Sequence, residues 1–242
     1  MKFSPYLVTL LLTIGFVQAQ TAETILRKHI ENSGGKEAWN KVKSIRIMTK
    51  MSLPMGELKT KIVQMKPNFI YTETDAMGHK IVQGYDGTDA WMINPMTGSN
   101  AVQSMPEPMT KQLLQSQQSL EPDWIYYKEK GYEVILKGTE EVDGVETYKL
   151  QIIKDKDSAE KVYFYFDKEN YMPVSTSLTM ASETGTSTSI QTKLSDYKET
   201  NLGILMPHRY ETSIMGQNSV IIFDEVVMNE SIDKNIFKRP SE

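Results

Sequence analysis

Histidine, serine and acidic side chains are the groups in this chain whose chemistry could support catalysis or metal binding. The three histidines, His29, His79 and His208, fall on separate predicted elements without the spacing of a ligand motif, and there is no cysteine to complete a zinc site. No G-x-S-x-G sequence is present to place a serine on a strained, activating turn. The residue types therefore predict no metal, no cofactor and no serine nucleophile.

Two Asp-Gly pairs, Asp86-Gly87 and Asp143-Gly144, each stand between runs of alternating hydrophobicity. Asp-Gly is among the commonest sequences of tight hairpins because both residues tolerate positive φ, so we interpret both pairs as turns. We predict that the protein is not an enzyme. One enzymatic alternative stays open, in which His208 or Glu211 acts as a base on a lipid, although the sequence shows no partner for either residue.

Period-two hydrophobicity predicts the strands that must position these residues. The runs, each closed by turn residues, are 45–53, 57–66, 69–75, 79–85, 89–94, 131–138, 145–153, 161–167, 173–182, 188–199, 204–214 and 217–228. Helical spacing around Gly34-Gly35 predicts two short helices over 21–44, before the sheet. We therefore predict a mainly β protein with one antiparallel sheet of about 11–12 strands, which is wide enough to curl.

One face of this sheet is predicted to be apolar and the other polar, because apolar and polar residues alternate along the strands. A concave apolar face needs a cover, which only the N-terminal helices and an insertion at about 95–130 can supply. The parts predict an incomplete, half-open β-barrel with a helical lid. We expect its cavity to be lined by Ile204, Met206, Tyr210, Ile214, Leu178, Met180 and Trp91, and we expect Met180 to be shielded from solvent there.

The N-terminus has the pattern of a cleavable export signal. Lys2 is followed by an apolar run from Tyr6 to Phe16 and by the small residues Val17 and Ala19, so we predict a signal peptide at 1–19. The run is about eleven residues, against the roughly 20 that a membrane-spanning helix needs. We expect residues 20–242 to form one soluble domain. The 27 basic and 31 acidic residues of the full chain give no charge pattern for nucleic-acid binding.

Methionine is frequent, with 15 residues against seven phenylalanines. Met55, Met77 and Met215 each precede a glycine at a predicted turn, and all three turns fall at the same end of an up-and-down sheet. The insertion that carries Met96 begins from that end too. Two interpretations stay open: these side chains fill gaps under the lid, or they form a flexible apolar rim that adapts to varied guests.

Short motifs in 66–95 resemble a known family. Lys66-Pro67-Asn68, Asp86-Gly87, Trp91 and Asn94-Pro95 follow one another as K-P-N…D-G-x-x-x-W-x-x-N-P, with a closing Phe237-x-x-Pro240. This order resembles LolA, the periplasmic carrier of outer-membrane lipoproteins. Two further segments, Gly34-Gly35-Lys36 and Ser195-Asp196-Tyr197-Lys198, are similar to the lipoprotein-sorting proteins of Bacteroidetes.

The resemblance implies a lidded half-barrel in the periplasm whose apolar cavity shields acyl chains. It also implies delivery of an acylated lipoprotein or lipid from an inner-membrane exporter to an outer-membrane acceptor, and we expect a monomer. In the family an arginine directly before the strand-opening proline holds the lid closed through hydrogen bonds. Lys66 occupies that position here, and because lysine lacks the planar guanidinium fork, the latch is expected to be weaker or absent.

An acyl chain of ~14 carbons gains about 10 kcal/mol on leaving water, at roughly 0.8 kcal/mol per CH₂. A lidded apolar cavity would shield such a chain during transfer through an aqueous compartment. We therefore predict a periplasmic carrier that delivers lipoproteins toward the outer membrane. The alternative in the same class is a binder or sensor of another lipid, such as a glycolipid or an isoprenoid, because apolar lining residues do not distinguish these chains.

Overall fold

The computed structural model describes residues 20–53, 56–115, 120, 122–158, 160–181, 187–214 and 217–241. The predicted signal peptide at 1–19 lies outside the described residues, as do Met55, Met215 and the side chain of Ile214. Within the described ranges, none of the helices combines the length and the apolar character that crossing a bilayer requires.

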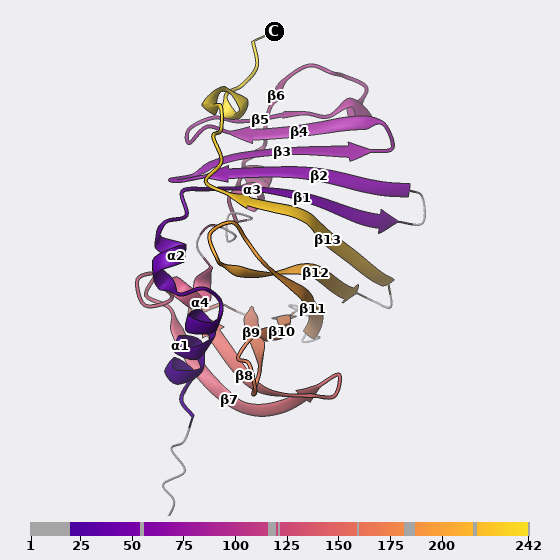
Figure 1. The fold of residues 1–242 in the computed structure, drawn as a ribbon. Coiled ribbons are helices and arrows are strands. Elements are labelled where there is room, and N and C mark those ends of the chain that lie inside the picture. The colour runs from indigo at the N-terminus through magenta and orange to yellow at the C-terminus, as the bar shows by residue number, and fades with distance from the viewer. Residues whose placement is uncertain are drawn as a thin grey trace, which may run out of the picture.

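The described strands form one 13-stranded antiparallel sheet, which runs in the order β6-β5-β4-β3-β2-β1-β13-β12-β11-β10-β9-β8-β7. Figure 1 shows it as a curled layer that does not close. The strands are β1 (Ser44–Leu53), β2 (Gly56–Met65), β3 (Phe69–Ala76), β4 (His79–Tyr85), β5 (Ala90–Ile93), β6 (Gln103–Ser104), β7 (Glu133–Val142), β8 (Val145–Ile153), β9 (Lys161–Asp167), β10 (Pro173–Ala181), β11 (Ser187–Glu199), β12 (Leu205–Ile214) and β13 (Gln217–Met228).

The predicted fold class is confirmed. Each of the twelve predicted runs corresponds to a strand, and the thirteenth is β6, a two-residue strand inside the insertion that pairs with β5. Two residues are too few to give a period-two signal, which is why the sequence did not reveal β6. The short edge at β6 and the charged edge at β7 leave little regular backbone for unwanted strand pairing.

Turn chemistry explains the hairpins. Asp143 and Gly144 both have positive φ, at 51° and 83°, and therefore form a tight turn between β7 and β8. The Asp86 carboxylate accepts hydrogen bonds from the backbone N–H groups of Thr88 and Asp89 at 2.9 and 2.8 Å. Both Asp-Gly pairs thus occupy turns, as the sequence predicts.

The helices are α1 (Ala22–Asn32), α2 (Lys36–Asn40), α3 (Glu107–Gln115) and α4 (Asp123–Tyr126). They pack on the face of the sheet that carries Ile45, Ile70 and Leu150, which we call the helix-covered face. α1 contributes Ile25 and Leu26 to a cluster on β8 and β9, whereas α3 places Leu113 on β3 and β5. The N-terminal helices and the insertion therefore both supply cover to the apolar face.

Gly34 brings the chain between α1 and α2 against the sheet. A Cβ atom at this position would lie 2.4 Å from the carbonyl oxygen of Gly203, and the φ of Gly34 is 111°. The backbone of Leu205 donates to the carbonyl of Ser33 at 3.1 Å in the same region. Only glycine permits this close approach, which attaches the helices to the start of β12.

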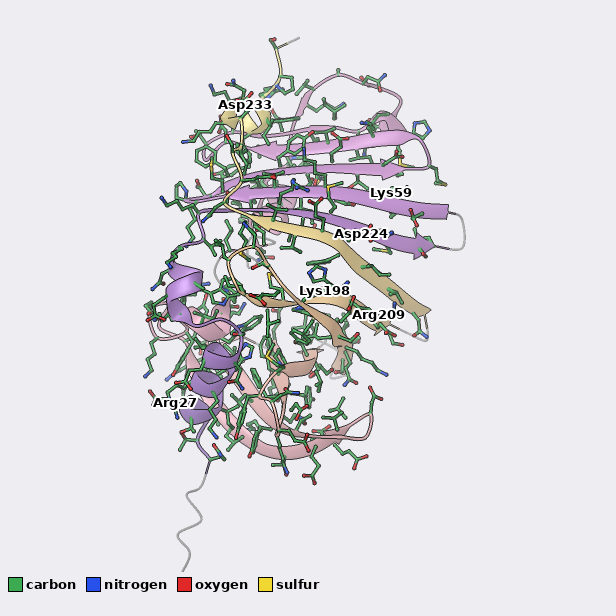
Figure 2. The ribbon with its side chains drawn as sticks, in the orientation of Figure 1. Arg27, Lys59, Lys198, Arg209, Asp224 and Asp233 are labelled. Atoms are coloured by element: carbon green, nitrogen blue, oxygen red, sulfur yellow. The ribbon has the colours of Figure 1, made fainter. Side chains whose placement is uncertain are left out.

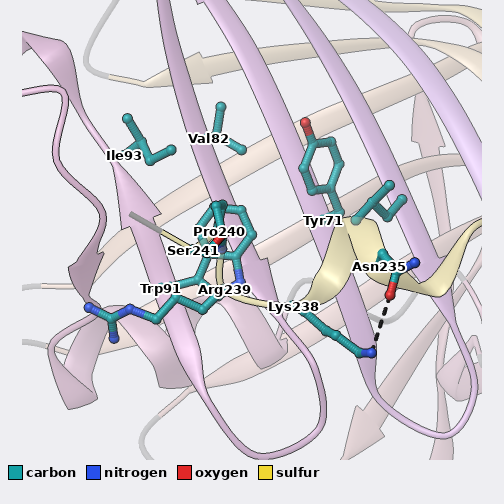
Figure 3. Close-up of a pocket in the computed structure, with 10 residues that line it drawn as sticks. Tyr71, Val82, Trp91, Ile93, Asn235, Lys238, Arg239, Pro240 and Ser241 are labelled. Carbon is teal, nitrogen blue, oxygen red and sulfur yellow. Dashed lines mark hydrogen bonds between the residues drawn. The ribbon is translucent and has the colours of Figure 1, made fainter.

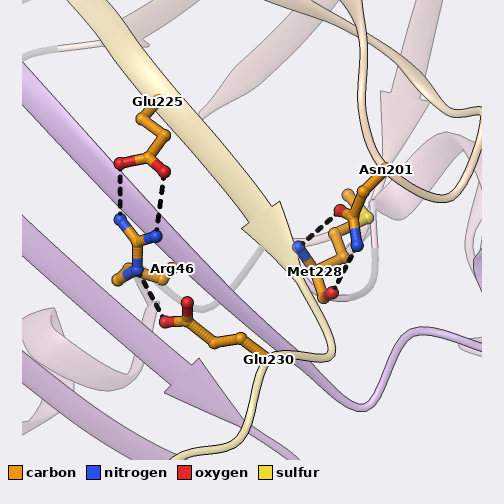
Figure 4. A network of polar contacts seen from close by, with 5 residues as sticks. All are labelled: Arg46, Asn201, Glu225, Met228 and Glu230. Atoms are coloured by element: carbon orange, nitrogen blue, oxygen red, sulfur yellow. Dashed lines mark hydrogen bonds and ion pairs between the residues drawn. The ribbon is translucent and has the colours of Figure 1, made fainter.

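The opposite face of the sheet carries Arg46, Tyr71, Trp91 and Arg209 and is largely charged along β1, β2, β12 and β13. The Arg46 guanidinium contacts the carboxylates of Glu225 and Glu230, with bonds of 2.6 to 3.0 Å (Figure 4). Figure 2 shows further charged side chains, including Lys59, Asp224 and Arg209, on these strands. This face is stabilised by ion pairs and needs no helical cover.

The side chain of Asn201 joins the β11–β12 turn to the end of β13. Its amide donates to the carbonyl of Met228 and accepts from the N–H of Met228, both at 2.8 Å (Figure 4). It thereby satisfies backbone groups at the end of the last strand.

His29 is the one histidine that α1 buries in the core. Its ring is 3% exposed and lies 5.2 Å from the Phe166 ring and 6.0 Å from the Trp124 ring, centroid to centroid. Burial lowers the pKa of His29 to about 4, while a hydrogen bond with the backbone of Tyr171 opposes this shift. The imidazole is therefore neutral in the folded protein at neutral pH.

We expect stability to depend on pH through His29. An unfolded histidine titrates near 6.5, so between that value and about 4 the unfolded state binds the extra proton. The contribution of neutral, buried His29 to the free energy of unfolding should be fully present above about pH 6.5. It should fall by on the order of 3 kcal/mol as the pH is lowered to about 4. When the free energy of unfolding is measured by urea denaturation from pH 4 to 7.5, its dependence on pH should be weaker in His29→Gln than in the native chain. An identical slope would contradict the assignment.

Candidate functional site

Burial along the helix-covered face differs between its two ends. Where β1 begins, Ile45, Met228 and Ile204 are buried completely or almost so, and α1, α2 and α4 lie beside this end of the strands (Figure 1). Toward the other end of the same strands, apolar side chains are only half-buried. We call this half-buried set the open patch; it comprises Met51, Leu58, Leu178, Tyr210, Ile221 and Phe223.

Register makes most of the open patch continuous. Met51 of β1 pairs with both Leu58 and Ile221, and Ile221 pairs in turn with Tyr210 of β12. The rings of Tyr210 and Phe223 lie 4.6 Å apart at 32°. Burial raises the pKa of the Tyr210 hydroxyl above its ordinary value.

Threonine hydroxyls interrupt the apolar surface beside the open patch. The Thr60 and Thr74 hydroxyls lie 3.1 Å apart across β2 and β3, and those of Thr192 and Thr212 lie 2.8 Å apart across β11 and β12. All four residues are half-buried. The uncovered part of the face therefore combines apolar contact with hydroxyl groups that can donate or accept hydrogen bonds.

The structure places the predicted cavity residues in different environments. Ile204 and Met206 are buried in the core cluster that includes Trp39 and Ile125. Tyr210 and Leu178 belong to the open patch, and Met180, expected to be shielded, is half-buried near the end of β10. The residues share one face, but the helices already fill the half that contains Ile204 and Met206.

Trp91 is wrongly assigned to the cavity, because it lies on the opposite face. It pairs with Gly84, and a Cβ atom at Gly84 would lie 2.4 Å from the indole ring, which therefore sits directly over the glycine. The indole Nε1 donates to the carbonyl of Phe237 at 2.8 Å. All four residues of β5 are apolar. Because no polar residue marks the solvent side, the sequence pattern could not identify which side of this strand faces the helices.

A cavity of about 560 Å³ adjoins Trp91 between the opposite face and the C-terminal segment (Figure 3). Its lining includes Tyr71, Val82, Trp91 and Ile93 from the sheet, and Lys238 and Arg239 from the segment. We call it the C-terminal pocket. No local pattern indicates this pocket, because its walls come from residues about 150 positions apart in the chain.

The methionine turns lie at one end of the sheet. The β3–β4 turn carries Met77, which is 54% exposed, and the 3-10 helix after β5 carries Met96, which is 60% exposed. The Met77 side chain approaches Gly56 of the neighbouring β1–β2 hairpin. Antiparallel order puts the β12–β13 turn at this same end. Met55 and Met215 themselves lie outside the described residues.

Lys66, the predicted latch, lies next to the insertion. Its ammonium group is 5.9 Å from the centre of the Tyr126 ring in α4, and Lys36 approaches the same ring at 5.7 Å. Lys36 also pairs with Glu129, and the Tyr126 hydroxyl donates to Asn40 at 3.2 Å. Cations therefore contact α4 from α2 and from the end of β2.

The two candidate bases do not meet. His208 is buried on the helix-covered face, with Nδ1 2.6 Å from the carbonyl oxygen of Phe223. Glu211 follows the opposite alternation and pairs with Arg209 at 2.7 Å. Among the described residues, no three His, Cys, Asp or Glu side chains are grouped so that they could hold a metal ion.

Comparisons with known proteins show a likeness of fold. No protein-family model matches the sequence. No curated protein matches it either. A DUF1329 family protein from Desulfovibrio piger is similar over 91% of this chain and 98% of its own, with a TM-score of 0.56 and 12% identity.

A LolA superfamily protein from Nitrosomonas europaea is similar with a TM-score of 0.53 and 18% identity, over 91% of this chain and 99% of its own. A structure titled as an outer-membrane lipoprotein-sorting protein domain, from Vibrio parahaemolyticus, has a TM-score of 0.53 and 15% identity, over 89% and 97% of the two chains. At these identities the comparisons establish the fold.

The position of Lys66 predicts a measurable effect on the insertion. We expect Lys66→Ala to speed amide exchange across 95–115 and 122–130 by about two- to fivefold, because a partly exposed cation–π contact contributes about 0.5–1 kcal/mol. Lys66→Arg should preserve or slow exchange. Lys59→Ala, in β2 and paired with Glu57, is the control. Unchanged exchange in both Lys66 variants would leave closure to apolar packing alone.

Proposed function

We propose that this protein is a periplasmic carrier that shelters acyl chains of lipoproteins on its helix-covered face and delivers them toward the outer membrane. The observation that carries the proposal is the burial gradient: helices seal one end of the apolar face and leave the open patch half-buried at the other. A face of this kind offers an apolar chain a place to leave water without unfolding the core.

The lid segments support this role. α3 and α4 belong to the insertion, and both pack on the helix-covered face through Leu113 and Ile125. We infer that a displacement of these two helices would expose the apolar residues that they cover, such as Ile70 under α3 and Ile45 beside α4. The fold neighbours named for lipoprotein sorting are consistent with a carrier built on this architecture.

Partners and location belong to the same proposal. A carrier of this kind would accept its acylated cargo from an inner-membrane exporter and release it to an outer-membrane acceptor, acting as a monomer in the periplasm after loss of residues 1–19. No chemistry on the lipid is required, and we propose binding and transfer in place of catalysis. Unchanged lipid after incubation with the protein would support this, whereas turnover would favour the enzymatic alternative.

A second candidate function is a binder or sensor of another lipid. The paired hydroxyls of Thr60 with Thr74, and of Thr192 with Thr212, favour a guest that has hydrogen-bonding groups beside its chain, as a glycolipid does. Native mass spectrometry of protein purified from its own periplasm separates the two. A bound acylated polypeptide supports the carrier, whereas a bound glycolipid supports the second candidate.

Ile221 and Ile222 provide a matched test of the open patch. They are adjacent in β13 and both half-buried, but Ile221 pairs with Tyr210 on the helix-covered face and Ile222 pairs with Arg209 on the opposite face. We expect Ile221→Glu to weaken binding of a diacylated lipopeptide at least tenfold, because the chain would bury an unpaired carboxylate. Ile222→Glu should bind normally. Equal binding by the two folded variants would contradict the proposal.

The exposed methionines predict a further dependence. Met77 and Met96 are accessible to mild peroxide, whereas Met228 is 1% exposed and should resist it. Oxidation makes the exposed side chains polar, so lipopeptide loading should fall while thermal stability changes little. The double variant to Ser should reproduce the loss, and the double variant to Leu should retain loading because Leu keeps the apolar volume. Normal loading by the Ser variant would show that these methionines are incidental.

A further inference from the structure

The C-terminal pocket is a second place where this protein can hold a ligand. We propose that it binds a single-chain anionic amphiphile, of the type of a medium- or long-chain carboxylate. Its volume of about 560 Å³ lies within the roughly 300–1,000 Å³ typical of small-molecule sites. The inference concerns the opposite face and is independent of the proposed carrier function.

The floor of the pocket is apolar and fixed. Val82 and Ile93 pair across β4 and β5 and flank Trp91 on the same face. Trp91 is 2% exposed, and its bond to the Phe237 carbonyl joins the floor to the C-terminal segment. Phe237 is fully buried and packs on Phe69 at 5.4 Å between ring centroids. The floor therefore needs no rearrangement to accept an alkyl chain.

The rim of the pocket is cationic. Lys238 and Arg239 line it, and no aspartate or glutamate is among its lining residues. Lys238 donates to the neutral side chain of Asn235 at 3.2 Å (Figure 3). Arg239 donates to the Ser104 hydroxyl at 2.8 Å and to the Val102 carbonyl at 3.4 Å, and it forms a long ion pair with Asp89 at 3.7 Å that leaves guanidinium donors for a second anion. The two positive charges therefore retain the capacity to pair with an anion.

The combination of floor and rim specifies the ligand class. Val82 and Ile93 offer contact to a hydrocarbon chain, and so does the ring of Tyr71, whose hydroxyl already donates to the Glu73 carboxylate at 2.9 Å. Lys238 and Arg239 can fix a carboxylate at the mouth, where it stays partly hydrated and avoids the cost of full burial. A neutral chain would lose the ionic contact, and a cationic chain would be repelled.

The pocket and the open patch lie on different faces of the sheet. Tyr71 and Trp91 face the pocket, whereas their neighbours Ile70 and Met92 pack with Leu113 under α3. A ligand in the pocket is therefore distinguishable from one in the open patch by its distance from the tryptophans. Trp91 adjoins the pocket, whereas Trp39 and Trp124 belong to clusters on the helix-covered face.

The test is titration of the full mature chain with dodecanoate, dodecanol and dodecylammonium below their critical micelle concentrations. We expect dodecanoate to bind at least tenfold more tightly than either analogue. Bromododecanoate should quench tryptophan fluorescence in the native chain, and this quenching should be lost in Trp91→Phe. Quenching that persists in Trp91→Phe would place the ligand on the helix-covered face and overturn the proposal, as would equal affinity for dodecanol.

Variants separate charge from fold. Lys238→Gln combined with Arg239→Gln should weaken dodecanoate binding at least tenfold. Lys59→Gln combined with Lys193→Gln removes the same charge elsewhere on exposed side chains and should have no effect. Val82→Trp should block the pocket while Ile221→Glu leaves binding unchanged. Full affinity in both the Lys238/Arg239 variant and Val82→Trp would overturn the proposal, as would loss of binding in Ile221→Glu alone.

Discussion

An antiparallel sheet with one apolar face must bury that face against another layer, and the thirteen strands in the described part of the chain do not close into a barrel that would do so. The cover comes from short helices in two parts of the chain that are far apart in sequence. α1 and α2 precede β1, and α3 and α4 lie inside the insertion. Trp124 of α4 packs against the clusters on both sides of it, so the insertion joins the N-terminal helices to the sheet. Because these helices are short, they seal the face near Ile45 and Ile204 and leave the surface around Tyr210 and Ile221 half-buried. The candidate carrier surface is thus a consequence of incomplete cover.

The opposite face is covered differently. Along β1, β2, β12 and β13 its charged side chains form ion pairs with one another, such as Arg46 with Glu225 and Glu230, and need no further layer. Strands β3 to β5 carry the ion pair of Glu73 with Lys80 there, but also the apolar residues Val82, Trp91 and Ile93. The chain returns after β13 and packs Phe237 on Phe69 beside them. The cover is again partial, and the space left beside Trp91 is the C-terminal pocket. Each face therefore carries one incompletely covered apolar region, and the thickness of the sheet separates the two.

Local pattern was sufficient for the elements and for most face assignments. Tyr210, Leu178 and Met206 share a face because side chains alternate along strands, and this holds in any antiparallel arrangement. Trp91 shows where the reasoning fails: β5 reads Ala90-Trp91-Met92-Ile93, with no polar residue to mark the outer side. β6 was missed because two residues carry no period. Met180 was expected to be shielded but is half-buried. Shielding depends on which helix covers a position, and the residue pattern along β10 does not contain that information.

Period and turn chemistry are local properties, and they were enough to predict the order and approximate positions of the twelve longer strands and the position of the insertion. Tertiary structure alone decided how far the helices extend over the apolar face, which places Ile204 in the core and Ile221 at its margin. It also decided that Lys66 meets Tyr126, and that Trp91 meets Phe237 across 146 positions of sequence. Such contacts depend on the curl of the sheet and the path of the connections, and these arise from the packing of the whole chain.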